Sequence, residues 1–383
     1  MIYLDANATT PLLPEVFDAM LPWLKDGFAN PSGSYAAAKR ARKAIDHARG
    51  QVAALIGAQP EEIVFTGGGT ESVNTALRSL DRLTGEGTAL VSAIEHSAVL
   101  RCVESFQRGR FLAPVDSLGK LRPEDFGKAL DQAAFVSIMT VNNETGVIQP
   151  LAELVAMARE KGLPVHTDAI QAAGKIPLDV ARLGVDMLSL SAHKFHGPKG
   201  VGALFVRSGL RFEPMLLGGG QESGRRSGTE NIAGIVGMGA AAEFAMRYLA
   251  ENPAVSLRDL FEAEVLQSTR GVTVNGDVGS RTWNTSHLSF EGCDAAGLLI
   301  LLDETGVACS AGSACMTGKQ KPSHVQIAMG IPEARAKSSL RFSFSRLNTE
   351  AEALQAARAV ARAVEKLRGV QGLGVGPVVV YSA

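Results

Sequence analysis

Short runs of apolar residues alternate along this chain with longer stretches in which apolar positions recur at the helical period. The runs that predict buried strands lie at residues 63–65, 90–93, 135–141, 165–167 and 187–190. A stretch such as residues 151–161, by contrast, has the pattern of a helix. Since strands that alternate with helices usually pair in parallel, we expect an α/β fold with a mainly parallel sheet flanked by helices.

The pattern changes after the middle of the chain. An alanine-rich stretch at residues 232–249 predicts a long helix. After Pro253 the pattern restarts as a smaller α+β unit, which ends in a predicted helix at residues 350–367. We therefore place a domain boundary near Pro253.

The composition fits an ordinary soluble protein and excludes some partners. With 383 residues, of which 46% are hydrophobic and 20% charged, the chain is long enough for two or more packed units. Its net charge of -1, from mixed acidic and basic residues, supplies no basic surface for direct binding of nucleic acid. Because the start reaches Asp5 before any long apolar run, we expect no secretory signal, no membrane span and a cytoplasmic location.

The cysteines are too few for a disulfide scaffold, and no CxxC pair suggests a zinc or cluster site. They are Cys102, Cys293, Cys309 and Cys315. At least one of them could instead be kept for its reactivity. Three histidines, His193, His196 and His324, have no arrangement that fixes a ligand geometry, so we expect no metal.

Polar clusters follow several predicted strands and could converge on one pocket at the carboxyl ends of the sheet. These clusters read GGGTES, EH, NNE, DAIQ and SAHK. In the first, three glycines precede Thr70 and Glu71, which open a helix whose free N–H groups and positive end could hold a phosphate. A tight turn that requires glycine torsions is an equally good explanation of this segment alone.

Lys194 lies between two histidines in the segment SAHKFHGPKG, directly after a predicted strand. Its amine could act there as a nucleophile, although a lysine in a surface loop is the commoner explanation. Asp168 ends another predicted strand. Because a pyridinium cofactor requires both a Schiff-base lysine and an ionised carboxylate partner, the two residues together favour such a cofactor.

Eight short motifs, in this order and spacing, resemble those of the cysteine desulfurases of the iron–sulfur and nitrogen-fixation type. The motifs are YLDANATTP, VFTGGGTES, EHSAV, VNNETG, HTDAIQ, SAHKFHGPKG, GGGQESGRRSGTEN and CSAGSAC…KPSHV. That group belongs to the class V aminotransferases of pyridoxal 5'-phosphate (PLP) fold type I. The resemblance implies a large PLP-binding domain at residues 15–253. Residues 1–14 and 254–383 would form a small α+β domain that carries the loop of the active-site cysteine.

The resemblance also implies roles for the residues that match. Lys194 would be the Schiff-base lysine, Asp168 would pair with the pyridine nitrogen, and His96 would stack on the ring and shuttle protons. Gln171 would lie near the phenolic oxygen. The phosphate would be held by Gly69, Thr70, Ser191 and His193, joined by Thr229 from the partner subunit of a homodimer.

The implied activity is removal of sulfur from free L-cysteine. Asn143 and Arg341 would bind the substrate, and Cys315 would take the sulfur as a persulfide, leave alanine, and pass the sulfur to an acceptor protein. From the residues alone, however, Arg341 is better explained as the partner of a structural carboxylate, and His96 as a satisfied buried histidine.

Three positions depart from the family pattern. The family often has histidine where this chain has Tyr35 and Gln221, so the contacts of those two loops are open. Cys309 replaces a more usual apolar residue, and we interpret it as a small buried hydrophobe. Cys102 and Cys293 are also interpreted as structural.

Two other functions remain possible from the sequence. Another class V reaction, such as transamination or selenocysteine lyase chemistry, would use Lys194 and Asp168 without needing Cys315 on a long loop. A PLP-fold protein that has lost its chemistry could serve as a scaffold in sulfur transfer. The long segment between GSAC and KPSHV argues against the first, and the complete set of site residues argues against the second.

Overall fold

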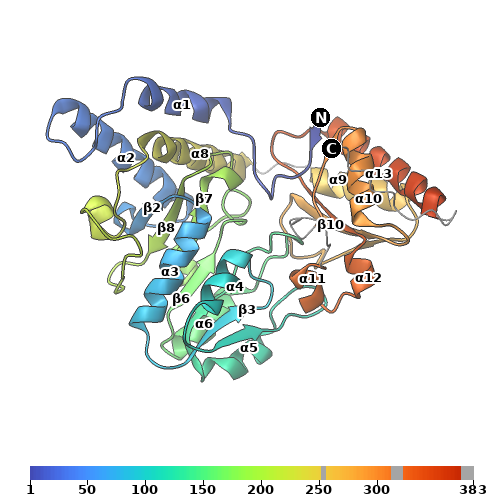
Figure 1. Cartoon of the computed structure of the whole chain (residues 1–383), viewed down its shortest axis with the longest axis horizontal. Coiled ribbons are helices and arrows are strands. Elements are labelled where there is room, and N and C mark those ends of the chain that lie inside the picture. Colours follow the sequence, from blue (N-terminus) through green and yellow to red (C-terminus); the bar gives the residue numbers. More distant parts are fainter. Residues whose placement is uncertain (252–255, 312–321, 372–383) are drawn as a thin grey trace, which may run out of the picture.

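The fold is built around a seven-stranded sheet with the strand order β2-β8-β7-β6-β5-β3-β4 (Figure 1). A computed structural model describes residues 1–251, 256–311 and 322–371. The strands are β2 (Ile63–Thr66), β3 (Thr88–Ser92), β4 (Arg110–Ala113), β5 (Ala133–Ser137), β6 (Val165–Asp168), β7 (Met187–Ser191) and β8 (Gly202–Val206). β8 is antiparallel to β2 and β7, whereas the other neighbours pair in parallel. The mainly parallel sheet predicted from the sequence is therefore confirmed.

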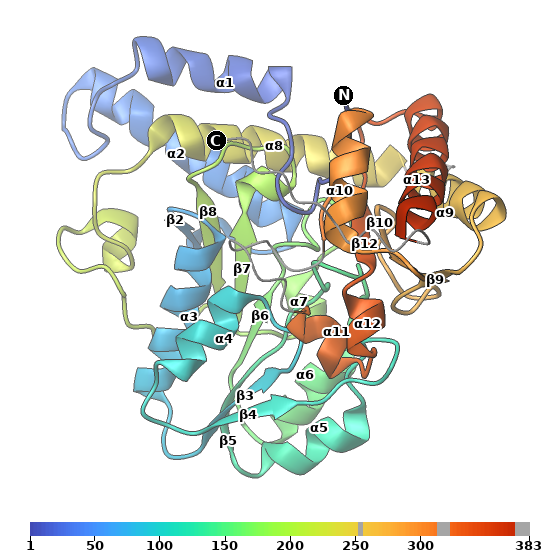
Figure 2. The ribbon, with the colours of Figure 1, turned by 45° about the vertical axis from the view of Figure 1, so that its right-hand side comes forward.

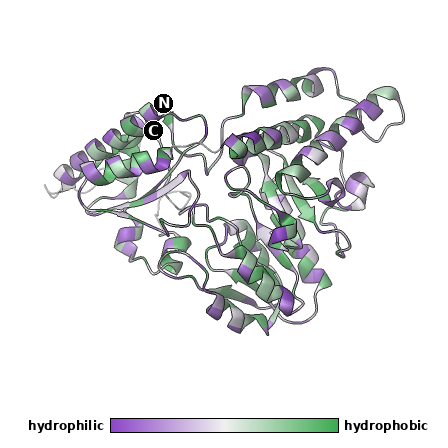
Figure 3. Ribbon diagram, turned by 180° about the vertical axis from the view of Figure 1, so that it is seen from behind, coloured by the Kyte–Doolittle hydropathy of each residue, from purple (hydrophilic) through white to green (hydrophobic). Residues whose placement is uncertain are grey.

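Both faces of this sheet are buried, which explains why its strands are almost continuously apolar. Side chains alternate across the sheet: Ile63 and Phe65 belong to one hydrophobic core, and Val64 belongs to another on the opposite face. Figure 3 shows the strands in green, for hydrophobic residues, and purple hydrophilic residues on the helices around them. The helices of this part are α1 (Pro14–Lys25), α2 (Ala36–Leu55), α3 (Gly69–Leu83), α4 (Ser97–Glu104), α5 (Pro123–Leu130), α6 (Leu151–Glu160), α7 (Val180–Leu183) and α8 (Ile232–Glu251).

Helix α8 confirms the prediction of a long helix at residues 232–249. By length and composition alone it is apolar enough to cross a membrane, and half of its most apolar window is buried within the protein. The helix packs against α1 and α2. Its small residues allow this close approach, since a Cβ added at Gly239 would lie 2.7 Å from the Cα of Ala48 in α2. Burial between helices therefore accounts for the apolar character of α8.

A third hydrophobic core lies beneath a three-stranded antiparallel sheet. This sheet has the order β12-β10-β9 and is covered by three helices (Figure 2). The elements are β9 (Val272–Val274), β10 (Thr285–Phe290), β12 (Ser339–Ser343), α9 (Leu257–Ser268), α10 (Ala295–Glu304) and α13 (Glu350–Gln371). The predicted helices at 151–161 and 350–367 correspond to α6 and α13.

The first residues of the chain belong to this third core. Strand β1 (Ile2–Tyr3) pairs in parallel with β11 (Val307–Ala308), and Ile2 and Leu4 are buried there. Helices α11 (His324–Ala328) and α12 (Glu333–Ala336), by contrast, contribute residues to the core beneath the large sheet. We propose that the cores on the two faces of the large sheet mark the large domain and that the third core marks the small domain. The expected boundary at Pro253 lies outside the described residues.

One predicted strand was too long. The apolar run at residues 135–141 suggested a strand to Val141, but β5 ends at Ser137. Beyond it, Val141 forms an isolated antiparallel bridge with Ile148 across a tight turn. The side chain of Asn142 accepts hydrogen bonds from the backbone of Glu144 and Thr145 and stabilises this turn. The apolar residues after Ser137 are buried because the turn packs inward.

Candidate active site

The polar residues predicted to converge do lie at one edge of the large sheet. Asp168 is the last residue of β6, Ser191 is the last residue of β7, and His96 follows β3. Because β3, β5, β6 and β7 are parallel, their carboxyl ends meet at this edge. The N-terminal segment that precedes α1 crosses the same place, where Thr10 donates to the backbone oxygen of His193.

A cavity of about 480 Å³ lies at the start of α3. Its lining residues are Ala8, Thr9, Gly67, Gly68, Gly69, Thr70, Glu71, Ser191, His193, Lys199 and Gly200. The first N–H groups of a helix have no carbonyl partner within the helix, so α3 offers free donors and a positive end to an anion here. The four residues expected to hold a phosphate from within one chain therefore share one cavity.

Glycine is needed at the start of α3 for two physical reasons. Gly68 has a φ of 146°, which L side chains rarely adopt. A Cβ added at Gly69 would lie 2.4 Å from Cδ1 of Ile170 and 3.2 Å from Cβ of Ser191. The glycines thus let α3 approach the ends of β6 and β7 closely enough to form the cavity.

Thr229 is exposed and does not line this cavity within the single chain. Its loop is nevertheless tied to the cavity edge, because Nε of Arg226 lies 2.9 Å from Oε1 of Glu71. Gln221, one of the departures from the family pattern, accepts a hydrogen bond from the backbone N–H of Gly228 at 3.2 Å and so closes the same loop. The other departure, Tyr35, is exposed at the start of α2.

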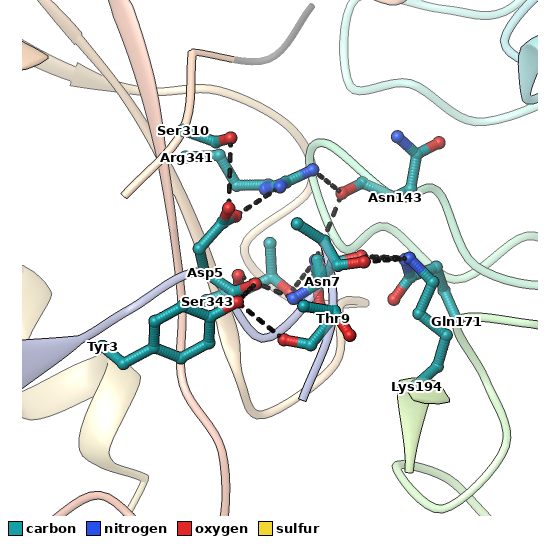
Figure 4. A network of polar contacts seen from close by, with 12 residues as sticks. Tyr3, Asp5, Asn7, Thr9, Asn143, Gln171, Lys194, Ser310, Arg341 and Ser343 are labelled. Atoms are coloured by element: carbon teal, nitrogen blue, oxygen red, sulfur yellow. Dashed lines mark hydrogen bonds and ion pairs between the residues drawn. The ribbon is translucent and has the colours of Figure 1, made fainter. Parts of the chain in front are cut away.

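Lys194 ends a single 3-10 turn, η2 (Ala192–Lys194), directly after β7. Its Nζ donates hydrogen bonds to the backbone oxygens of Asn7 and Ala8, at 2.6 and 2.8 Å (Figure 4). Burial and the charge of Arg341 lower the pKa of Lys194 from 10.5 to about 8, against the opposing effect of Asp168. About a tenth of the amine is therefore neutral, and nucleophilic, at pH 7, far more than for a lysine of ordinary pKa.

This pKa predicts how the cofactor-free protein should take up added PLP. The neutral amine is the reactive form, so the rate should rise with pH and level off above about pH 8. At pH 7 it should be about 300-fold higher than for a lysine of ordinary pKa, because each pKa unit changes the neutral fraction about tenfold. The rate is measured by the absorbance of the bound cofactor, with a lysine peptide as the control for titration of PLP itself. A rate that keeps rising to pH 10 would contradict the lowered pKa.

Asp168 is buried at the end of β6. Burial raises its pKa to about 6, while the N–H of Ile170, 2.9 Å from Oδ1, and the charge of Lys194 act in the opposite direction. The carboxyl is thus mostly ionised at pH 7 but lacks the stabilisation of bulk water. A cationic ring nitrogen placed beside it would stabilise this buried charge and would itself stay protonated.

His96 caps the N-terminus of α4. Its Nδ1 accepts a hydrogen bond from the backbone N–H of Ala98 at 3.1 Å. Desolvation by the surrounding protein, followed by the charges of Lys194 and His324, lowers the pKa of His96, although its side chain reaches the surface. The ring is therefore neutral at pH 7, and since Nδ1 is the acceptor, the proton sits on Nε2. The ring thus carries a proton that it can donate, and it lines a neighbouring cavity together with Thr70.

Gln171 lies at the centre of a buried network that the sequence did not predict. Its Nε2 donates to the backbone oxygen of Asn7 at 2.9 Å, and its Oε1 accepts from Nζ of Lys175 at 2.5 Å. Lys175 also donates to Oδ1 of Asn7 at 3.1 Å, and its burial lowers its pKa well below 10.5. Asn7 therefore links Gln171 to Lys194, because its backbone oxygen accepts from both side chains.

Arg341 in β12 is joined to this network from the side of the small sheet. Its Nη1 donates to the backbone oxygen of Asn143 at 3.0 Å, and Nη2 lies 2.6 Å from Oδ1 of Asp5 (Figure 4). Nδ2 of Asn7 also donates to the backbone oxygen of Asn143, at 3.1 Å. The structural carboxylate expected from the residues alone thus exists, and it is Asp5. The structure also brings Arg341 and Asn143 together.

Cys315, the expected sulfur acceptor, lies outside the described residues. Cys102, Cys293 and Cys309 are free thiols. Burial raises the pKa of Cys102 to about 11, that of Cys309 to about 12 and that of Cys293 above its ordinary value. These three thiols are poor nucleophiles at neutral pH. Within the described part of the chain, no group of three or more His, Cys, Asp or Glu side chains could hold a metal ion.

Comparison with known proteins places this site in a family. The sequence profile described as aminotransferase class-V matches residues 2–355. The chain belongs to the class V aminotransferase family. A cysteine desulfurase of Gluconacetobacter diazotrophicus is 44% identical over 376 residues, which cover 96% of this chain and 94% of that protein. The family and fold class predicted from the sequence are confirmed.

Two solved structures share the fold of the chain. A NifS-like protein has a TM-score of 0.89 at 34% identity and covers 96% of this chain and 100% of its own. A protein named SspA, solved in complex with cysteine, has a TM-score of 0.80 at 35% identity and covers 90% of this chain and 99% of its own. The name of the Gluconacetobacter diazotrophicus relative and the cysteine in the second structure agree with the activity predicted from the sequence motifs.

Proposed function

We propose that this chain is a PLP-dependent cysteine desulfurase that moves sulfur from L-cysteine to Cys315 and releases L-alanine. The main support is the convergence of an anion-binding helix start, a lysine of lowered pKa and a buried carboxylate at one sheet edge. The desulfurase relatives in the same family support the choice of substrate.

The residues present fit PLP in charge and in shape. The cavity at the start of α3 suits its phosphate, with Gly69, Thr70, Ser191 and His193 as ligands and Lys199 as an added positive charge. Lys194 would hold the cofactor covalently, Asp168 would pair with its ring nitrogen, and Gln171 would lie near its phenolic oxygen. When bound, PLP would supply an electron sink that stabilises negative charge on the substrate carbon.

The protein's own groups would then bind the substrate and move its protons. Arg341 and Asn143 would hold the amino acid by its polar groups, with the guanidinium facing the α-carboxylate. Nζ of Lys194 would take the Cα proton, and Nε2 of His96 would donate a proton at the mouth of the site.

Sulfur transfer requires no outside oxidant. The Cys315 thiolate would attack the substrate sulfur, forming a sulfur–sulfur bond while the bond between sulfur and the substrate carbon breaks. The electron pair of the broken bond stays with the carbon, which is protonated to give alanine. One thiol and one cysteine thus become one persulfide and one alanine.

The direct test is incubation of the PLP-loaded protein with L-cysteine and a reducing thiol. We expect alanine and sulfide in equal amounts, because the thiol releases the sulfur carried on Cys315. A transaminase would instead form a keto acid, and an inactive scaffold would form neither product. Either of these results would refute the proposal.

We further propose that the enzyme works in the cytoplasm as a homodimer and delivers sulfur to an acceptor protein. The dimer would bring Thr229 of one subunit to the phosphate site of the other, since Thr229 is exposed in its own chain. Light scattering should give twice the chain mass at assay concentrations. A monomer with full activity would contradict the shared site.

A further inference from the structure

The ion pair between Asp5 and Arg341 joins two segments that are far apart in the sequence. Oδ1 of Asp5 lies 2.6 Å from Nη2 of Arg341, across a separation of 336 residues. Both side chains are largely buried, with exposed fractions of 18% and 7%. Charges at such a site are costly to desolvate, so a buried pair by itself is weak evidence for a stabilising role.

The guanidinium is only partly used by the protein. It carries five N–H donors, and the contacts with Asp5 and Asn143 engage one donor each on Nη2 and Nη1. Nε of Arg341 is buried and has no hydrogen-bond partner within the described part of the chain. A buried donor without a partner costs free energy, which a ligand oxygen could recover. The remaining N–H groups can therefore donate hydrogen bonds to a further anionic group.

The carboxylate of Asp5 is held in place by its backbone and by a neighbouring side chain. The hydroxyl of Tyr3 donates to the backbone oxygen of Asp5 at 3.1 Å, and Asp5 forms a bridge with Ser343 of β12. Oγ of Ser310 donates to Oδ2 of Asp5 at 3.4 Å. Asp5 thus presents a fixed negative charge to one side of the guanidinium (Figure 4).

Asp5 and Arg341 also contact Ser310, which precedes Cys315 in the sequence. Ser310 pairs with Arg341 in an antiparallel bridge, with N–O distances of 2.7 and 3.2 Å. Ser310 is only a few residues before Cys315 in the sequence. The backbone of Arg341, the carboxylate of Asp5 and the hydroxyl of Ser310 therefore form one connected group.

We propose that Asp5 is a positioning residue, which orients Arg341 so that its free donors meet the α-carboxylate of the amino-acid substrate. This inference rests on the proposed function. Asp5 accepts from one N–H group of the guanidinium, which fixes the orientation of the group. The N–H groups that are still without a partner stay available to the substrate. If Asp5 instead competed with the substrate for Arg341, its removal would strengthen substrate binding. Removal of the Asp5 charge should therefore raise KM for L-cysteine if Asp5 positions Arg341, and lower it if Asp5 competes with the substrate.

The test is the Asp5→Asn variant of the PLP-loaded enzyme. Asparagine has nearly the same size but carries no charge, so Arg341 loses its fixed partner. We expect KM for L-cysteine to rise about tenfold while kcat changes little. This is the result expected when an interaction that is equally strong in the substrate complex and in the transition state is weakened. Calorimetric binding of L-alanine, which has the carboxylate but no sulfur, should weaken to a similar extent. An unchanged or lower KM would overturn the inference.

The matched control is Glu262→Gln. Glu262 forms another buried ion pair, with Arg281, in which Oε1 lies 2.5 Å from Nη2 and the side chains are 10% and 3% exposed. It also accepts from Ser286 at 2.7 Å. This variant should lose thermal stability but keep its KM. An equal rise of KM in both variants would mean that the effect of Asp5 is only structural, and would overturn the inference.

A second variant covers the case in which Asp5→Asn does not fold. Asp5→Glu keeps the charge pair but lengthens the side chain, so the guanidinium is displaced while folding is retained. Its KM should rise, and a wild-type KM would overturn the inference. Failure of the proposed function is a separate result, because the wild-type enzyme would then release no alanine from cysteine.

Discussion

Cys315→Ser should lose alanine formation from L-cysteine while the protein keeps its fold and its bound cofactor. The hydroxyl is close in size to the thiol, and no contact proposed for the cofactor involves this side chain. A thiol with a pKa near 8.5 is partly ionised at neutral pH, whereas a serine oxygen scarcely is, and it reacts poorly with sulfur. We expect the rate to fall by at least about a thousandfold, as for the loss of other enzymatic nucleophiles.

Cys309→Ser is the matched control, because its thiol is half-buried and its pKa is raised to about 12. This variant should lose stability at most and keep its rate of alanine formation. Mass spectrometry after a pulse of cysteine should find the added sulfur on the peptide of Cys315 in the wild type and in Cys309→Ser. Alanine formation by Cys315→Ser at the wild-type rate would make the desulfurase mechanism wrong in its central step.

Lys194→Ala should lose the covalent bond to PLP and, with it, catalysis. Borohydride reduction of the wild-type protein should fix PLP to the peptide that contains Lys194, because the pKa of about 8 makes this amine far more reactive at neutral pH than an ordinary lysine. The variant should yield no such adduct, and its activity should fall by at least about a thousandfold. Mass spectrometry of the reduced protein and the visible spectrum before reduction measure both effects.

Lys199→Ala is the control for this result. Lys199 lines the same cavity but is exposed, so its loss should weaken the affinity for PLP and leave the trapped adduct on Lys194. Trapping on another lysine in the wild-type protein would assign the covalent role elsewhere. A colourless protein that takes up no PLP would refute the cofactor proposal as a whole.

The sequence was informative wherever a function depends on a local pattern. The strand ends that carry Asp168 and Lys194 were predictable, because apolar runs mark buried strands and the polar residues follow them directly. The glycines before Thr70 fitted an anion site and a tight turn equally well. Only the resemblance to a family, however, distinguished this site from a tight turn.

Contacts between distant segments were not predictable in this way. Nothing near Asp5 or Asn7 in the sequence indicates that their partners are Arg341 and Lys194. The sequence did not predict a role for Lys175, because a single buried lysine produces no recognisable sequence pattern. Its contacts with Gln171 and Asn7 are seen only in the folded protein. The overlong strand at residues 135–141 has a similar origin, since apolar residues in a buried turn resemble a strand.

The placement of the N-terminal segment determines when the site can be completed during synthesis. Asp5 is made before its partner Arg341, which follows 336 residues later in the sequence. At about 5–20 residues per second, translation needs roughly 17–70 seconds to cover that distance. The large sheet can fold in this interval, but the network around Lys194 lacks Arg341 until β12 has been made. Assembly of the substrate-binding side is therefore a late folding step, and nascent chains halted before β12 should lack it.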